Sequence, residues 1–364
     1  MSVCGIRLVR CGTNSCRQYS PASTSATCLP KKRTHPAFRA TLRTVSSTVQ
    51  RSPVWMRSVG SLGGFRRFAW GVLAYNILVI LWGAYVRASG SGAGCGDHWP
   101  LCNGQVVPRA PRIETMIEYS HRLTSGLSVI VVVGLCAWAF LLFPRGNRVR
   151  KLAGASVVFL FVEAMLGAGL VLFNVGQTAS IGHTIYLSAH LANTLLLLAA
   201  LVLTAWFAEG SEARLRLREI PWPFWATLPL AMFVCITGTV AALGDTAFPS
   251  ASLSAGIRQD FSPTASFLVR LRMFHPFVAA ISGLLFAAVA VFALRVTERP
   301  KMRALAMTIV IVTFVQLCAG VLNLALLAPV WMQILHLFLA DIVWIALVLF
   351  VAEAARPISV PLRR

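Results

Sequence analysis

The sequence predicts an all-α polytopic membrane protein in which eight transmembrane helices form two pseudo-symmetric four-helix bundles. Three observations favour this fold class. Apolar residues make up 57% of the 364 residues and charged residues only 12%, with a mean hydropathy of +0.72, whereas soluble domains carry about 25% charged residues. The apolar residues gather in long runs, and the second half of the chain weakly repeats the first.

Eight apolar runs follow one another from Phe68 onward, and each is close to the ~20 residues that a membrane-spanning helix needs. We expect the helices at residues 68–86, 117–143, 152–173, 185–207, 222–243, 272–294, 304–329 and 331–351. The chain then divides into four parts. These are a basic and disordered extension (1–66), an amino-terminal bundle (67–210), a carboxy-terminal bundle (211–355) and a tail (356–364).

The net charge is +21, because 33 Lys and Arg residues oppose 12 Asp and Glu residues. Such a charge can indicate nucleic-acid binding, but twelve of the basic residues precede Phe68 and much of the rest lies in connectors between the apolar runs. We therefore expect no nucleic-acid partner. The positive-inside rule places the basic connectors 145–151, 214–218 and 295–303, and both ends of the folded region, on the cytoplasmic or matrix side.

The first 67 residues are rich in Arg, Ser and Thr, and no acidic residue occurs before Asp97. This composition is typical of a mitochondrial transit peptide. The alternative is a stretch translated from an upstream start codon that has no function. The short connectors and a cysteine pair in the first outward loop favour a bacterial membrane. We therefore expect the bacterial cytoplasmic membrane rather than the mitochondrial inner membrane.

The two halves of the chain align as a weak internal repeat. HLANTLLLLAALVL from His190 aligns with HLFLADIVWIALVL from His336, and FVEAMLGAG in the third run aligns with FVQLCAGVL in the seventh. Gly83 and Gly238 lie at similar exits of the first and fifth runs. Because each half has four spans, an even number, we expect parallel repeats about an axis along the membrane normal.

Four of the seven histidines lie near the outer starts of the second, fourth, sixth and eighth runs, at one depth: His121, His190, His275 and His336. An ionisable residue inside a membrane indicates a functional site. Imidazoles from two alternate helices can bind a haem iron from both faces, so we predict one haem in each bundle. Any one of these histidines could instead bond a neighbouring helix, and His183, on the same face as His190, is a rival ligand.

The first outward loop contains CGDHWPLC, in which Cys95 and Cys102 can close a disulfide on the oxidising side of the membrane. The bond can be a structural staple or take part in redox chemistry, and both remain open. His98 lies between the cysteines, but two cysteines and one histidine make an incomplete zinc site. Three cysteines lie within the apolar runs, where we expect them to act as small apolar residues: Cys136, Cys235 and Cys318.

Glu118 precedes His121 by three residues and so lies on the same helical face. A carboxylate at this depth is costly unless it has a function or a partner; the alternative is a salt bridge to Arg122 or Arg87. Three residues before His275 the charge is reversed, because Arg272 stands there. We infer that the first half handles protons, while the second binds a haem propionate and moves electrons.

The segment GAYVRASGSGAGCGDHWPLCNGQVVP, followed by IEYSHR, resembles the haem A synthase family, membrane enzymes that convert haem O to haem A for terminal oxidases. The resemblance covers roughly residues 65–353. It implies that His121 and His190 hold the iron of the substrate, haem O, and that His275 and His336 hold a permanent haem b as cofactor.

By the same resemblance, Glu118 is the catalytic residue, and Cys95 and Cys102 match the extracytoplasmic pair of the bacterial members. We add Arg272 and Arg87 as expected propionate partners. The chain departs from the expected pattern at one polar position in the third run, where Glu163 stands although Gln316 occupies the aligned place in the seventh.

The resemblance implies an oxidoreductase that turns a ring methyl of haem O into a formyl group, by successive hydroxylations and loss of water. Haem O, the haem O synthase that supplies it and a homo-oligomeric assembly are the expected partners; the electron donor or acceptor stays open. The alternative is a bis-haem b electron carrier, which needs the same four histidines but no Glu118 or thiol pair. A transporter built from repeats has less support, because its broken helices are missing from the pattern.

Overall fold

The computed structural model describes residues 62–173, 180–209 and 215–356, and the expected all-α membrane fold is confirmed for them. They contain eight helices that are long and apolar enough to cross a membrane. In chain order these are α2 (Leu62–Ala88), α3 (Ile113–Leu142), α4 (Arg148–Leu172), α5 (Ile181–Phe207), α6 (Trp222–Ala247), α8 with α9 (Phe267–Arg272 and Phe274–Val296), α10 (Pro300–Ala325) and α11 (Val330–Ala354). The extension before Leu62, most of the tail and the boundary at 210/211 lie outside the described residues.

Several helices begin or end beyond their apolar runs. The helix α4 begins at Arg148 rather than at 152, because the Asn147 side chain caps it by accepting a hydrogen bond from the Val149 N–H. A helix backbone continues through charged residues once it is capped, so the apolar run marks only the part inside the hydrocarbon. The run ending at 329 was too long. Leu327 and Ala328 have positive φ angles of 61° and 54°, which end α10 before Pro329.

One helix was not expected. The helix α7 (Leu253–Asp260) lies in the connection between α6 and α8, and the Ser252 hydroxyl caps it by accepting a hydrogen bond from the Ala255 N–H. It is short and mostly polar, so a search for long apolar runs misses it. The following segment bends at Met273, which separates α8 from α9.

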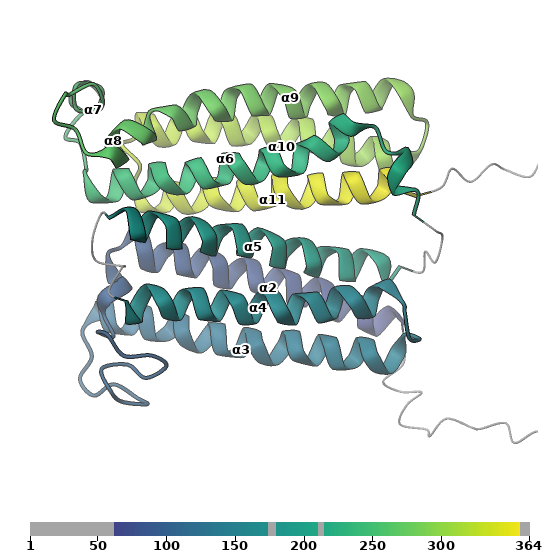
Figure 1. Cartoon of the computed structure of the whole chain (residues 1–364), viewed down its shortest axis with the longest axis horizontal. Helices are drawn as coiled ribbons and strands as arrows, with labels where there is room; N and C mark the ends of the chain where they lie inside the picture. Colours follow the sequence, from purple (N-terminus) through teal and green to yellow (C-terminus); the bar gives the residue numbers. More distant parts are fainter. Residues whose placement is uncertain (1–61, 174–179, 210–214, 357–364) are drawn as a thin grey trace, which may run out of the picture. The chain divides into compact units, whose positions relative to one another are not determined.

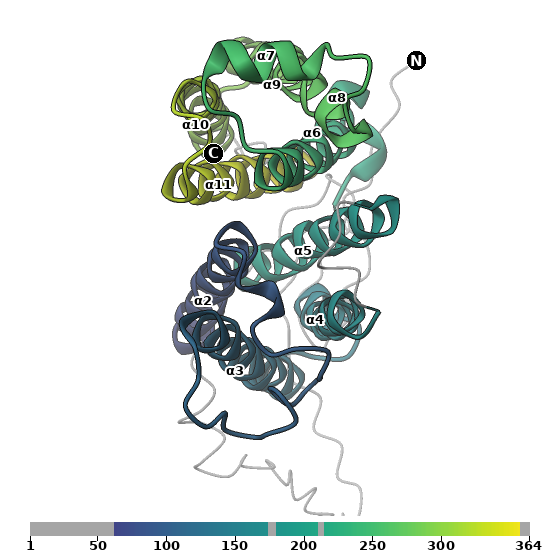
Figure 2. The ribbon, with the colours of Figure 1, turned by 90° about the vertical axis from the view of Figure 1, so that its left-hand side faces the viewer.

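The eight long helices form two groups of four, seen end-on in Figure 2. We call α2–α5 the N-terminal bundle, and α6, α8/α9, α10 and α11 the C-terminal bundle. The aligned residues Phe161 and Phe314 are 64% and 67% exposed, which fits side chains that face lipid. The bundles meet where α5 packs against α6 and α11 and where α2 packs against α11, and the Trp344 indole of α11 donates a hydrogen bond of 2.7 Å to the Leu195 carbonyl oxygen of α5.

The two ends of the helices differ in character. The segment 89–112, α7 and α8 lie together at one end, on the left of Figure 1, which we call the loop end. The basic connectors lie at the opposite end, where Arg299 pairs with Glu353 at 2.6 Å and Lys301 pairs with Glu209 at 3.3 Å. The outward orientation of the loop end, which the positive-inside rule predicts from these connectors, stays a prediction.

The Trp344 hydrogen bond gives a test of the contact between the bundles. Trp344→Phe removes the donor at a residue that is only 3% exposed, so we expect a loss of at least about 1 kcal/mol and a fall in unfolding temperature of about 2 to 4 °C. Thermal unfolding in detergent measures it. Trp222→Phe is the control, because Trp222 is 78% exposed; equal shifts in both variants would contradict the assignment.

Candidate functional site

Four histidine side chains lie near the loop end of alternate helices, and each is half-buried. His275 of α9 and His336 of α11 face each other in the C-terminal bundle, with ring centroids 6.4 Å apart and ring planes at 86°. A metal–imidazole bond takes up about 2.0–2.1 Å, so this separation has room for one metal ion between two ring nitrogens. The predicted ligand pair is therefore brought together in this bundle.

In the N-terminal bundle the corresponding histidines are His121 of α3 and His190 of α5. Three of the four histidines keep a buried Nδ1 atom without a hydrogen-bond partner in the described part of the chain: His121, His190 and His336. Buried polar atoms are nearly always paired in folded proteins, so these three rings have a hydrogen-bonding capacity that the described residues leave unused. The 6.4 Å separation of the His275 and His336 rings fits an iron held from two sides.

The hydrogen bonding of the fourth histidine, His275, indicates which of its ring nitrogens can bind a metal. The Thr237 hydroxyl donates to the Val234 carbonyl oxygen at 2.8 Å and lies 3.0 Å from His275 Nδ1. Since its single proton is used in the first bond, the hydroxyl oxygen accepts from Nδ1–H. Nε2 of His275 is then the nitrogen with a free lone pair, and the hydrogen bond fixes the ring as partners of metal-binding histidines commonly do.

Each histidine packs against a glycine of the preceding long helix. A Cβ atom built on Gly83 would lie 2.9 Å from His121 Cε1, and one on Gly238 or on Gly320 would lie 3.0 Å from Cε1 of the facing ring, His275 or His336. These distances are shorter than nearly all contacts that real Cβ atoms make. The glycines therefore let the imidazole edge touch the neighbouring backbone, as small residues do between membrane helices.

The fourth glycine behaves differently. A Cβ on Gly167 would meet His190 Cε1 at 3.8 Å, an ordinary van der Waals distance, so this pair is looser. The repeat in the sequence marks Gly83 and Gly238 without giving them a role, and it does not single out Gly320 or Thr237. The signal was present, because the four glycines recur in the same helices of both halves.

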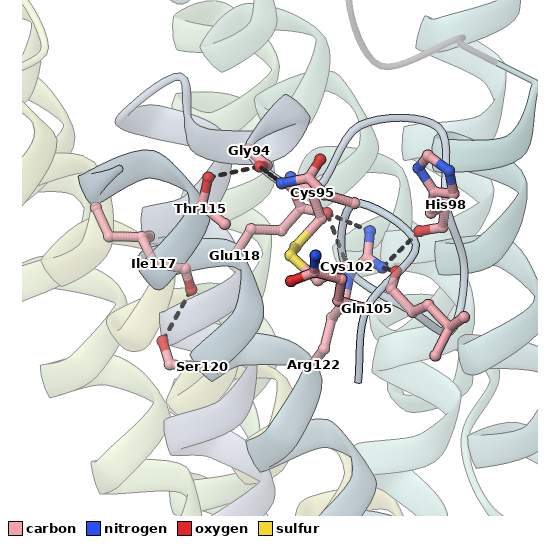
Figure 3. The surroundings of a disulfide bond; sticks show 12 residues. Gly94, Cys95, His98, Cys102, Gln105, Thr115, Ile117, Glu118, Ser120 and Arg122 are labelled. Carbon is pink, nitrogen blue, oxygen red and sulfur yellow. Dashed lines mark hydrogen bonds and ion pairs between the residues drawn. A yellow bond between two sulfur atoms is a disulfide. The ribbon is translucent and has the colours of Figure 1, made fainter. Parts of the chain in front are cut away.

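The disulfide loop covers the end of α3. Cys95 and Cys102 are joined by a disulfide bond, as predicted, and both are buried. The Cys95 N–H donates to Glu118 Oε2 at 2.8 Å, and Arg122 donates to Glu118 Oε1 at 2.6 Å through Nη2. Figure 3 shows the Glu118 and Arg122 side chains directed at this loop.

Arg122 also makes hydrogen bonds to the backbone of the loop. Its Nη1 atom donates to the carbonyl oxygens of His98 and Leu101, which lie between the two cysteines. On the opposite side, Thr115 Oγ1 donates to the Gly94 carbonyl oxygen at 2.7 Å. A Cβ on Gly94 would overlap the Glu114 carbonyl group, so this close approach requires glycine.

The ion pair of Glu118 is therefore made with Arg122, one of the two partners considered from sequence. Glu118 is only 4% exposed, and both of its oxygens accept hydrogen bonds from the loop or from Arg122. Its role as a base stays a prediction. The structure adds a second role, because the carboxylate fastens the disulfide loop to the helix that carries His121.

The two arginines expected to bind propionates make hydrogen bonds within the protein. Arg272 pairs with Asp260 at 2.8 Å and with Asp245 at 3.2 Å, which ties α8 to α7 and α6. Arg87 of α2 donates to Thr246 Oγ1 at 3.2 Å and to Gln333 Oε1 at 3.0 Å, and so links the two bundles. Their propionate roles stay predictions.

The remaining candidate residues are His183, His98 and the free cysteines. The N–H of His183 donates to Ser180 Oγ in the N-cap of α5, and its side chain is buried. His98 belongs to no cluster of metal-ligating side chains, since the described residues contain no group of three or more His, Cys, Asp and Glu suited to a metal ion. The free cysteines of the described ranges lie within the helices: Cys136, Cys235 and Cys318.

Comparison with known proteins identifies the family of this chain. Residues 66–348 match the COX15-CtaA family, described as cytochrome oxidase assembly protein. A protein of Thermus thermophilus named "Protoheme IX farnesyltransferase" is 45% identical over 309 residues, which are 84% of this chain and 49% of that protein. "Heme A synthase" of Alkalihalophilus pseudofirmus is 41% identical over 138 residues, which are 37% of this chain and 44% of that enzyme.

The matched part of the chain thus spans about half the length of these curated relatives. The family match is broader, because it extends from the first turns of α2 to the last turns of α11 and includes all four histidines, their glycines and the disulfide loop. The chain belongs to the COX15-CtaA family of cytochrome oxidase assembly proteins.

Proposed function

We propose that this protein is a haem A synthase, an oxidoreductase that converts a ring methyl of haem O to the formyl group of haem A. The observation that carries the proposal is the repeated pairing of a half-buried histidine with a glycine in both bundles, with the His275 and His336 rings 6.4 Å apart. Relatives named "Heme A synthase" from several bacteria support it.

The two bundles take different haems in this proposal. His121 and His190 hold the iron of the substrate haem O, and His275 and His336 hold haem b. Haem b, when bound, supplies one-electron transfer. The glycine contacts and, for His275, the hydrogen bond with Thr237 fix the positions of the imidazole rings. Rigid placement of ligands by neighbouring groups is the usual way in which a protein tunes such a site.

Glu118 is the proposed catalytic residue. When water supplies the formyl oxygen, oxidation of a methyl group releases electrons, which pass to an acceptor outside this chain, and protons, which a positioned carboxylate can accept. Glu118 lies one helical turn from His121 on α3, and its two oxygens are oriented by Arg122 and the Cys95 N–H. Exchange of one of these hydrogen bonds for the substrate proton turns the anchored carboxylate into a general base. Such a base contributes about 10²- to 10⁴-fold in rate.

The disulfide closes the loop whose Cys95 N–H orients Glu118. Redox use of Cys95 and Cys102 is a separate prediction. We propose the bacterial cytoplasmic membrane as the site of action, with the loop end outward. A haem O synthase is the proposed supplier of substrate. The relative named "Protoheme IX farnesyltransferase" matches this chain over only 49% of its own length. It therefore has a segment similar to this chain and a further part of its own, which favours a close link between the two activities.

The alternative function, a bis-haem b electron carrier, is separated by pigment analysis. We expect the purified protein to yield haem B together with haem O or haem A when its pigments are extracted and resolved by chromatography. Haem B alone would favour the carrier, and no haem at all would exclude both proposals. Loading with haem O and following haem A formation then tests the reaction directly.

The role of Glu118 is tested by Glu118→Gln. The amide keeps the shape and can still accept the Cys95 N–H, but it cannot take up a proton, so we expect haem O to bind and haem A formation to fall at least about 10²-fold. Thr115→Val is the matched control, because it removes the other anchor of the loop and leaves the carboxylate in place. An equal loss of haem A formation in both variants would mean that Glu118 only fastens the loop.

The glycine contacts predict unequal effects of one added methyl group. Gly83→Ala should displace the His121 ring and weaken the low-spin haem signal of the N-terminal bundle, since the new Cβ would lie 2.9 Å from Cε1. Gly167→Ala, at 3.8 Å, should retain that signal. Optical spectra of both variants loaded with haem B make the comparison. Equal retention would show that the glycines do not position the histidines.

A further inference from the structure

A half-buried carboxylate in the middle of α4 has no part in the function proposed so far. Glu163 Oε2 accepts a hydrogen bond of 2.6 Å from Asn193 Nδ2, and Glu163 Oε1 accepts one from Thr194 Oγ1. Both donors belong to α5 and are less than 10% exposed. An ionisable side chain inside a membrane-spanning helix is costly and commonly marks a function.

Neither donor depends on Glu163 for a partner. Asn193 Nδ2 also donates to the Phe159 carbonyl oxygen at 2.8 Å, and Thr194 Oγ1 lies 2.9 Å from the His190 carbonyl oxygen. The two side chains would thus be paired if the carboxylate were absent. The contacts fix the position of Glu163, but they do not explain why an acidic residue stands there.

The third neighbour is His190. Its Nδ1 atom is buried without a hydrogen bond, and it lies 3.5 Å from Glu163 Oε1. A hydrogen bond between them requires the ring, with its proton on Nδ1, to move closer to this oxygen, since N–H···O bonds are about 2.7–3.2 Å long. Nε2 then carries the free lone pair.

We propose that Glu163 is a positioning residue for His190: it accepts the Nδ1–H hydrogen bond and so holds the ring with Nε2 directed at the haem iron. The inference rests on the proposed function, in which His190 is a haem ligand. A carboxylate on the outer nitrogen of a metal-binding histidine fixes the ring and raises the basicity of the ligand. A more basic ligand stabilises the oxidised iron, so the carboxylate gives the haem of the N-terminal bundle a lower reduction potential than an amide at the same position would give.

The C-terminal bundle lacks this arrangement. Gln316 of α10 stands at the aligned place, but its amide nitrogen lies 3.3 Å from His336 Nε2, and His336 Nδ1 has no hydrogen bond within the described residues. A neutral amide therefore stands where the other bundle has an acid. The two halves thus share the histidine ligands, but the side chains beside His190 and His336 differ.

Glu163→Gln tests the proposal in the full protein loaded with haem B. We expect haem to stay bound, the midpoint potential of the N-terminal haem to rise, and its EPR g values to change, while the C-terminal haem keeps both properties. His190→Ala and His336→Ala assign each signal to its bundle. Thr194→Val is the control, because it breaks a contact between α4 and α5 but leaves the carboxylate beside His190.

The outcomes separate this inference from the proposed function. Unchanged potential and g values in Glu163→Gln, with haem bound through His190, would overturn the inference alone. The same holds if Thr194→Val shifts the potential as far as Glu163→Gln, because Glu163 would then be only a clamp between helices. If His190→Ala leaves the low-spin signals intact, both proposals fail.

A second variant covers the case in which Glu163→Gln does not fold. Glu163→Asp keeps the charge but withdraws it from Nδ1, so we expect a smaller rise in potential in the same direction. No rise, with haem retained, would contradict the inference.

Discussion

The site depends on four contacts in which an imidazole edge rests against the backbone of a neighbouring helix. At three of them an added Cβ atom would lie 2.9 to 3.0 Å from the ring, so that any larger residue would have to displace the imidazole, namely at Gly83, Gly238 and Gly320. Inside a membrane, small residues let helices and side chains approach without a loss of hydrophobic stabilisation, because lipid is as apolar as the protein interior. The rings are consequently placed by rigid helix backbone rather than by flexible side chains.

The helix α3 connects this arrangement to the disulfide loop. It carries His121 within the bundle, and close to it along the same helix it carries Glu118 and Arg122, which together hold the loop by backbone groups at and between the two cysteines. Thr115 and the close approach of Gly94 hold the loop from its other side. The loop is therefore joined by hydrogen bonds to the helix that carries a histidine of the site.

The two bundles share their histidines and glycines but differ in the charged neighbours of these residues. Glu118 and Arg272 stand at aligned places with opposite charges, and each is neutralised locally, by Arg122 in one bundle and by Asp245 and Asp260 in the other. The histidines, which would contact a haem iron, and the glycines behind them are therefore repeated in both halves. The charged residues near the histidines differ between the halves.

The sequence by itself determined the number of spans, the four histidines, the cysteine pair and the resemblance to a family. These properties are local: crossing about 30 Å of hydrocarbon requires a run of apolar residues in one helix, and a histidine within such a run is unusual wherever its neighbours lie. Only the tertiary structure decided that Glu118 also accepts the Cys95 N–H of the loop, that glycines face the imidazoles, and that Glu163 lies beside His190. Those pairings depend on the rotation and separation of packed helices, which no pattern along a single helix specifies. The ends of the helices and the short helix α7 were likewise settled by capping side chains such as Asn147 and Ser252, because a cap acts through one hydrogen bond rather than through hydropathy.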